Sequence, residues 1–152
     1  MGSGSKVTAI GGLAIDGTDK MVMTEWSALS KHLQFENSDA FPSFLARVSE
    51  FGSVKKLVNV HLEPQCEKEK IFTAPVTEVL IAKLRPETPR EKFEEILGLM
   101  HGGVKVTEGA VTSAHGITVE DPDTYVFVCG WESVEVRYLL SKSGKFKVLT
   151  CL

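Results

Sequence analysis

The sequence predicts an α+β fold in which one strand-turn-strand-helix unit occurs twice. The segment from Ala9 to His32 reappears, degenerate but without a gap, as the segment from Ser113 to Arg137. A constant offset of 105 residues relates the copies, so that Trp26 corresponds to Trp131. Internal self-similarity of this kind indicates a structural unit that was copied within one polypeptide.

Length and composition suit a compact chain and exclude two classes of partner. The 152 residues are 43% apolar and carry a formal net charge of -3, so one domain with an adequate core is expected. Basic residues are scattered among more numerous acidic ones, which excludes a nucleic-acid-binding face. No apolar run approaches about 18 residues, which excludes a membrane span. Residues 1–5 are interpreted as an expression scar rather than a signal peptide.

The cysteines indicate a reducing compartment. Cys66, Cys129 and Cys151 have no short spacing between any two, so there is neither a CxxC redox pair nor a zinc knuckle. We interpret all three as inert thiols of a cytoplasmic protein.

The first half, residues 6–64, is predicted to hold a hairpin, a helix and a further strand. Two segments rich in Val, Ile, Met and Thr, 6–15 and 20–26, flank an Asp-Gly-Thr-Asp turn, which is a hairpin signal. Ser27 and then Ser38 or Asp39 are helix-start candidates, and apolar residues recur at helical spacing from Phe41 until Gly52. A strand is predicted at 55–62, and the polar segment 63–70 links the halves.

The second half, residues 71–152, is more complete. Thr88-Pro89-Arg90-Glu91 has the composition of a capping box with proline at the first helical position. The helix that follows has an apolar stripe formed by Phe93, Ile96, Leu97 and Met100, and is predicted to stop at Gly102-Gly103. The other predicted elements are strands at 77–84, 109–119, 124–130 and 146–149 and a helix at 133–140.

The order of these elements is typical of a ferredoxin-like repeat. Strand, helix, strand, strand, helix, strand forms an antiparallel sheet with helices on one face, and the first half has only the last four elements. Two such sheets, packed through the faces that helices leave uncovered, would enclose a barrel, so both halves form one compact domain. The incomplete first half leaves strand edges open, and a homodimer is therefore expected.

The hairpin that ends in a Trp, followed six positions later by His or Arg, resembles the dimeric α+β barrel superfamily, and most of all its antibiotic-biosynthesis-monooxygenase-like (ABM-like) members. The matching residues are Trp26, Ser27, His32 and Phe35 in the first copy and Trp131, Glu132, Ser133, Glu135 and Arg137 in the second. The resemblance implies a small enzyme, usually without metal or organic cofactor. Members act on hydrophobic aromatic or polyketide-like molecules by oxygenation, cyclisation or decarboxylation, and some bind haem. The leading hypothesis is thus a tailoring enzyme of secondary metabolism.

The candidate catalytic residues lie on predicted strands and are expected to point into the barrel. His115 shares a strand face with Ser113 and Ile117, and imidazole, with an unperturbed pKa of about 6.5, accepts and returns a proton near neutrality. We predict that His115 is a general acid or base, assisted by His61 and Tyr125. Residues predicted to contact the substrate are Asn59, Ser113, Phe127, Trp131, Trp26 and His32.

A structural interpretation of each residue is open at this point. His115 fits a hydrogen-bonded structural histidine, the stripe that contains Tyr125 fits plain core, and the two tryptophans fit a shared packing role. His101 is predicted to bond to the terminal carbonyls of its helix. The scattered histidines predict no metal site. The rival functions are a non-catalytic ligand-binding or structural barrel and a haem-binding barrel.

Overall fold

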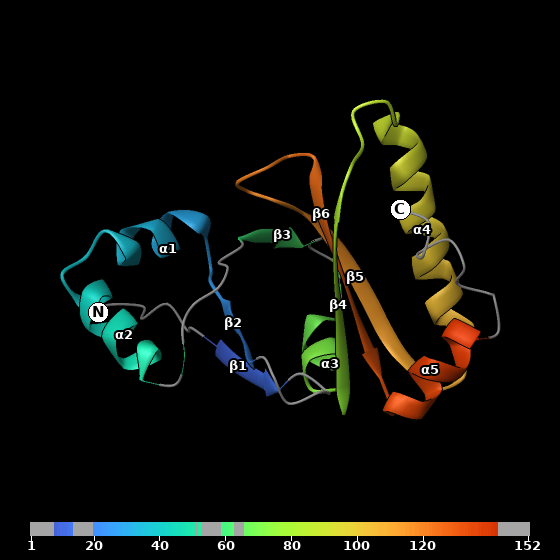
Figure 1. The fold of residues 1–152 in the computed structure, drawn as a ribbon, viewed down its shortest axis with the longest axis horizontal. Helices are drawn as coiled ribbons and strands as arrows, with labels where there is room; N and C mark the ends of the chain where they lie inside the picture. Colours follow the sequence, from blue (N-terminus) through green and yellow to red (C-terminus); the bar gives the residue numbers. More distant parts are fainter. Residues whose placement is uncertain (1–7, 14–19, 51, 53–58, 63–65, 143–152) are drawn as a thin grey trace. The chain divides into compact units, whose positions relative to one another are not determined.

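The computed structural model of the chain describes residues 8–13, 20–50, 52, 59–62 and 66–142 (Figure 1). The chain divides into a first unit, Met1–Leu57, and a second unit, Val58–Leu152. Each unit is described by itself below.

The first unit contains the predicted hairpin and two helices. Strands β1 (Thr8–Leu13) and β2 (Lys20–Glu25) pair antiparallel. Helices α1 (Leu29–Glu36) and α2 (Ala40–Ser49) follow. The predicted amphipathic helix is confirmed as α2, and α1 begins two residues after the candidate start at Ser27. Gly52, just beyond α2, has a φ of 153°, a conformation that side chains other than glycine rarely adopt.

The second unit is a four-stranded antiparallel sheet with helices, which confirms the predicted α+β, ferredoxin-like class. The sheet order is β3-β5-β6-β4. The strands are β3 (Val60–Leu62), β4 (Val76–Lys83), β5 (Ala110–Thr118) and β6 (Thr124–Trp131). The helices are α3 (Lys68–Phe72), α4 (Arg90–Lys105) and α5 (Val134–Lys142). The predicted strand at 146–149 lies outside the described residues, as does the part 55–58 of the predicted strand at 55–62.

The two sequence copies contain the same elements in the same order. Strands β1 and β2 correspond to β5 and β6, and α1 and α5 begin at Leu29 and Val134, which are 105 residues apart. The strand register differs by one residue, because Ala9 pairs with Thr24 whereas the corresponding Ala114 pairs with Val128 rather than Cys129. The repeat therefore predicts the succession of elements but not their pairing in detail.

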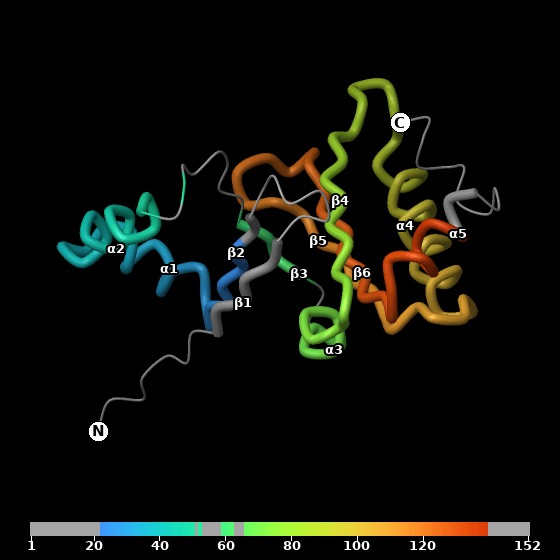
Figure 2. The backbone as a smooth tube through the Cα atoms, turned by 60° about the horizontal axis from the view of Figure 1, so that its bottom comes forward, coloured from blue at the N-terminus to red at the C-terminus, as the bar shows by residue number. Residues whose placement is uncertain are grey.

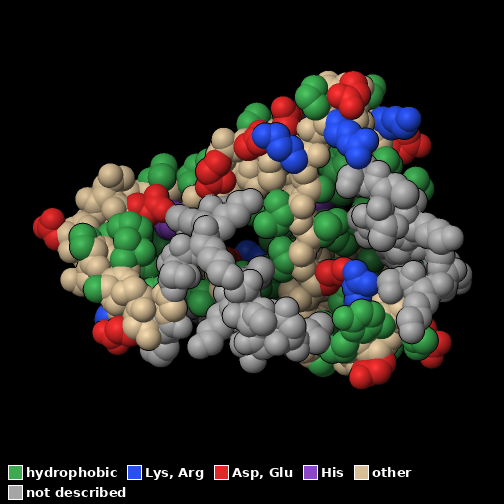
Figure 3. Space-filling model, viewed as in Figure 1, with side chains coloured by type: hydrophobic (Ala, Val, Ile, Leu, Met, Phe, Trp, Pro, Cys, Tyr) green, Lys and Arg blue, Asp and Glu red, His purple; other side chains and the backbone are tan. Residues whose placement is uncertain are grey.

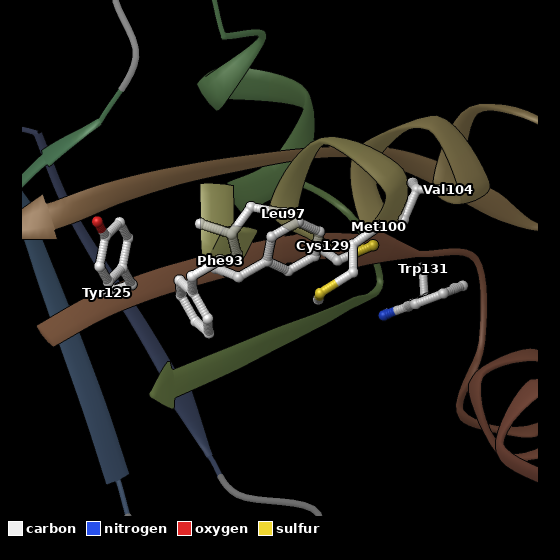
Figure 4. Packing of buried hydrophobic residues seen from close by; sticks show 8 residues of the cluster. Phe93, Leu97, Met100, Val104, Tyr125, Cys129 and Trp131 are labelled. Carbon is white, nitrogen blue, oxygen red and sulfur yellow. The ribbon is translucent and has the colours of Figure 1, made fainter. Parts of the chain in front are cut away.

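The two faces of the sheet in the second unit are covered by different helices (Figure 2). On one face, here called the α4 side, a cluster joins Phe93, Leu97, Met100 and Val104 of α4 to Tyr125, Phe127, Cys129 and Trp131 of β6 (Figure 4). On the opposite face, the α3 side, Ile71 of α3 is fully buried against Ala114, Val126 and Val128. Successive residues of each strand point to alternate sides, so the register assigns every strand residue to one face.

Helix α3 is an element that the sequence analysis missed. The segment around it was predicted to be a polar linker, and Glu67 to Lys70 are indeed exposed. Ile71 nevertheless anchors the helix, and the Thr77 hydroxyl donates a hydrogen bond to the Ile71 carbonyl at 3.0 Å. Gly130 permits this packing, since a Cβ there would lie 3.2 Å from the Cα of Ile71 and 2.9 Å from the Cβ of Ala74.

The ends of α4 also differ from prediction. No side chain caps its first turn and Pro89 stands at the cap position itself, so the predicted capping box does not form. The helix continues through Gly102-Gly103 to Lys105, although each glycine costs about 1 kcal/mol relative to alanine. Val104, one turn beyond Met100, is 2% exposed, and its burial offsets that cost.

Candidate functional site

A buried serine and a histidine of α4 form the most distinctive polar contact on the α4 side. The Nδ1 atom of His101 lies 2.7 Å from the Oγ atom of Ser113 on β5. Ser113 is 1% exposed, whereas His101 is half-buried. The predicted bond of His101 to the last carbonyls of its helix is wrong, because α4 continues beyond this residue and the ring turns to the sheet.

His115 lies on the same face of β5 as Ser113. It pairs with Phe127 of β6, and Ile117, two residues farther along β5, packs into the α4-side cluster. The Nδ1 atom of His115 is buried while the residue as a whole is half-exposed. The face shared by Ser113, His115 and Ile117 is therefore as predicted, and a β-bulge between Ala110 and Thr112 interrupts the alternation before it.

The edge strand β3 adds a third histidine to this side. His61 is exposed and pairs with Ile117, which assigns it to the α4 side. Asn59, which was predicted to contact the substrate, is bonded to the β5–β6 turn. Its backbone N–H and its Nδ2 both donate to Oε1 of Glu120 at 2.9 Å, which ties the start of β3 to the β5–β6 turn. We call His61, His101, Ser113 and His115 the histidine strip.

The location of the strip corrects one expectation. The candidates were expected to point away from the helices, into a barrel, whereas His61, His115, Tyr125, Phe127 and Trp131 all lie on the side that α4 covers. Strand parity predicts which residues share a face but not which face the helix occupies. The catalytic and binding roles of these residues stay predictions.

Tyr125 fastens α4 to the sheet. It is 1% exposed, and its ring centroid lies 4.8 Å from that of Phe93. The hydroxyl accepts a hydrogen bond from Nη1 of Arg90 at 2.7 Å and lies 3.4 Å from Oε1 of Glu94. Burial raises the pKa of this phenol above its ordinary value. Tyr125 is thus part of the packed core with its polar end satisfied by α4.

The two tryptophans are placed alike in their copies but have different partners. Trp131 donates from Nε1 to Oε2 of Glu78 at 3.1 Å, and Arg137 donates from Nε to Oε1 of the same carboxylate at 3.0 Å. In the first unit the His32 ring stacks directly on Trp26, with ring centroids 4.7 Å apart. In each copy the side chain six positions after the Trp is thus close to it. His32 stacks on the Trp26 ring, and Arg137 binds the same Glu78 carboxylate as Trp131.

The Cys129 thiol is predicted to be inert. It is fully buried, and burial together with the Glu78 carboxylate raises its pKa from 9.0 to about 12. The thiol form favours the folded state, so its contribution to stability is present below pH 9 and is lost as the pH rises towards 12.

At pH 8, iodoacetamide should label Cys129 at least about tenfold more slowly than the half-buried Cys66. Peptide mass spectrometry measures both rates; equal rates in the folded protein would contradict the burial, and equal rates in urea are the control.

Charges on the second unit are paired locally rather than gathered by sign. Figure 3 shows Lys and Arg side chains beside Asp and Glu on the face that it draws. The Lys83 ammonium lies 2.9 Å from the Asp121 carboxylate, and the Arg90 guanidinium lies 2.7 Å from the Asp123 carboxylate.

Among the described residues, no three His, Cys, Asp or Glu side chains are grouped so as to hold a metal ion. None of the helices in that same part of the chain combines the length and apolar character that crossing a bilayer requires.

Comparison with solved structures shows the fold. The chain is similar to the crystal structure of a Fusobacterium nucleatum subsp. nucleatum protein named "putative monooxygenase", with a TM-score of 0.53 and 14% sequence identity. The match covers 95% of this chain and 66% of that chain, so this chain spans slightly less than two thirds of its neighbour. No protein-family model and no curated protein matches the sequence.

Proposed function

We propose that the protein is a small enzyme that moves a proton on a hydrophobic aromatic or polyketide-like molecule, without a bound cofactor. The observation that carries the proposal is the hydrogen bond between Ser113 and His101 beside His115, on a sheet face whose buried cluster is mainly apolar. His115 is the general acid or base. The resemblance to ABM-like proteins and the fold shared with the F. nucleatum protein support an enzyme of this kind.

The surroundings of His115 suit this chemistry. Phe127 and Ile117 are its apolar neighbours on the sheet, and such surroundings favour the binding of a flat hydrophobic molecule. A neutral imidazole there takes a proton from a phenol or from a carbon beside a carbonyl. Oxygenation, cyclisation and decarboxylation of such molecules each include a proton transfer of this type.

The test begins with cells that make the protein. Small molecules that accumulate when the gene is removed are incubated with purified wild type and with His115→Ala. Wild type should consume a hydrophobic aromatic or polyketide-like compound, and His115→Ala should consume it about 10²-fold or more slowly. Lys92→Ala, at an exposed position of α4, should match wild type. A folded His115→Ala protein with full turnover would contradict the proposal.

A non-catalytic ligand-binding or structural protein is the second candidate, and one observation favours it. Tyr125, Phe127 and Trp131, the predicted cavity wall, are each 5% exposed or less in the core. Under this alternative, compounds raise the melting temperature of wild type and of His115→Ala alike, and neither protein consumes them.

A further inference from the structure

We propose that His101 is a second acid–base group, that Ser113 is its positioning residue, and that the reaction is the interconversion of an aromatic ketone with its enol. The inference rests on the proposed function, because it assumes that His115 takes part in proton transfer. It adds the reaction class, the substrate class and two roles that the sequence analysis did not assign.

Burial decides the role of Ser113. A serine hydroxyl beside a histidine is the usual arrangement of an activated nucleophile. At 1% exposure, however, the Ser113 hydroxyl is out of reach of a substrate. Its hydrogen bond instead fixes the His101 ring and selects which ring nitrogen carries the proton. Ser113 therefore acts through His101, whose ring is half-buried and reaches the surface of the strip.

The positions of His101 and His115 on one sheet face suit a substrate of one or a few fused rings. Ser113 and His115 are alternate residues of one strand, so their Cα atoms are about 7 Å apart. His101 approaches this face from α4, with Nδ1 2.7 Å from the Ser113 hydroxyl. A flat molecule that contacts both imidazoles can give a proton to one and take a proton from the other.

Helix α4 leaves room at the level of His115. Glu94 of α4 contacts Tyr125, whose partner on β5 is Ile117. One helical stretch farther on, His101 of α4 contacts Ser113 of β5. Gly98 is between Glu94 and His101 on the helix, and so lies near the level of His115. A Cβ at Gly98 would have no heavy atom within 4 Å. The absence of a side chain there keeps this flank of α4 open to a ring.

The proposed step is balanced by protons alone. Neutral His115 removes a proton from a methylene carbon that is conjugated with the carbonyl through an aromatic ring, and the C–H electron pair becomes part of a carbon–carbon double bond. Protonated His101 gives its proton to the carbonyl oxygen, which becomes the enol hydroxyl. His115 ends protonated and His101 neutral, and proton exchange with water restores both. No oxidant or reductant is required.

Anthrone, an aromatic ketone with an enolisable methylene group, is the probe. Deuterium uptake at that methylene from D₂O is followed without oxygen, over a range of pH, for wild type, His115→Ala, His101→Gln, Ser113→Ala and Ser113→Thr. Lys92→Gln on α4 is the control. Long-range ¹H–¹⁵N spectra report the tautomer of His101 in each protein.

Wild type and Lys92→Gln should accelerate uptake equally above buffer. His101→Gln should lower kcat about 10²-fold and remove one limb of the pH–rate profile. Ser113→Ala should lower kcat about tenfold, leave KM unchanged and mix the tautomers of His101, and Ser113→Thr, which keeps the hydroxyl, should restore both.

The outcomes separate this inference from the function beneath it. If His101→Gln keeps the wild-type rate while His115→Ala loses it, the role of His101 is overturned and the proposed function stands. If His115→Ala keeps the wild-type rate, the proposed function falls. Uptake no faster than in buffer overturns the ketone–enol assignment. An unchanged His101 tautomer in Ser113→Ala overturns the positioning role, and that spectrum is read whether or not the variant is active.

Discussion

Replacing Phe93 by alanine should lower the free energy of unfolding by about 3–5 kcal/mol. The Phe93 side chain is 3% exposed and packs against Tyr125 and Leu97 between α4 and the sheet. Its removal leaves a cavity that the fixed helix cannot close, so lost contacts add to the lost transfer energy. Urea denaturation measures the change.

Leu99→Ala is the matched control on the same helix. Leu99 is 70% exposed, and a substitution there should change stability by no more than about 0.5 kcal/mol. If Phe93→Ala were as mild as Leu99→Ala, then α4 would not pack on the sheet through the face described here.

Gly116→Ala should displace β3 from the sheet and lower stability by about 3 kcal/mol. A Cβ at Gly116 would fall on the carbonyl oxygen of His61 in the neighbouring strand. That oxygen belongs to backbone, so no side-chain rotation relieves the clash, and β3 must move away from β5. Loss of hydrogen-exchange protection in Val60 to Leu62, together with urea denaturation, measures the effect.

Gly98→Ala is the control for this change. A Cβ at Gly98 meets open space, and alanine is favoured over glycine inside a helix by about 1 kcal/mol. Gly98→Ala should therefore stabilise the protein. A Gly116→Ala protein that retains protected β3 amides would show that the two strands are not in the register described.

Much of the fold was predictable because periodicity and repetition report local structure. The pairs β1–β2 and β5–β6 follow from alternating apolar residues around short polar turns, and α4 follows from its apolar stripe. Helix α3 was missed because five residues carry too little periodicity, and only the burial of Ile71 reveals its role. The one-residue difference in hairpin register was beyond reach, since register depends on turn geometry and packing rather than on composition.

The site was predictable only in part. Alternation along β5 correctly grouped Ser113, His115 and Ile117 on one face. It could not predict that α4 covers this face, because alternation does not report which side of a sheet a helix occupies. His101 was missed because the glycine pair was interpreted as a helix end. The signal that identifies it is Val104, which extends the apolar stripe of α4 by one turn from Met100 and keeps His101 within the helix.

The difference between the two copies has a structural explanation. Arg137 binds the Glu78 carboxylate, which β4 supplies. In the first copy, His32 packs on the Trp26 ring instead. Barrel closure and homodimer formation stay predictions.

The proposed function requires that a flat aromatic molecule bind at the histidine strip. The 4 histidines of the chain give separate ring signals in ¹H–¹³C spectra, so one titration locates the site. Anthraquinone-2-sulfonate, a soluble and non-enolisable analogue of anthrone, serves as the ligand. The signals of His101 and His115 should shift together and saturate, while that of His32 stays in place. Shifts confined to His32, or no saturable shift at His101 and His115, would contradict the assignment of the site.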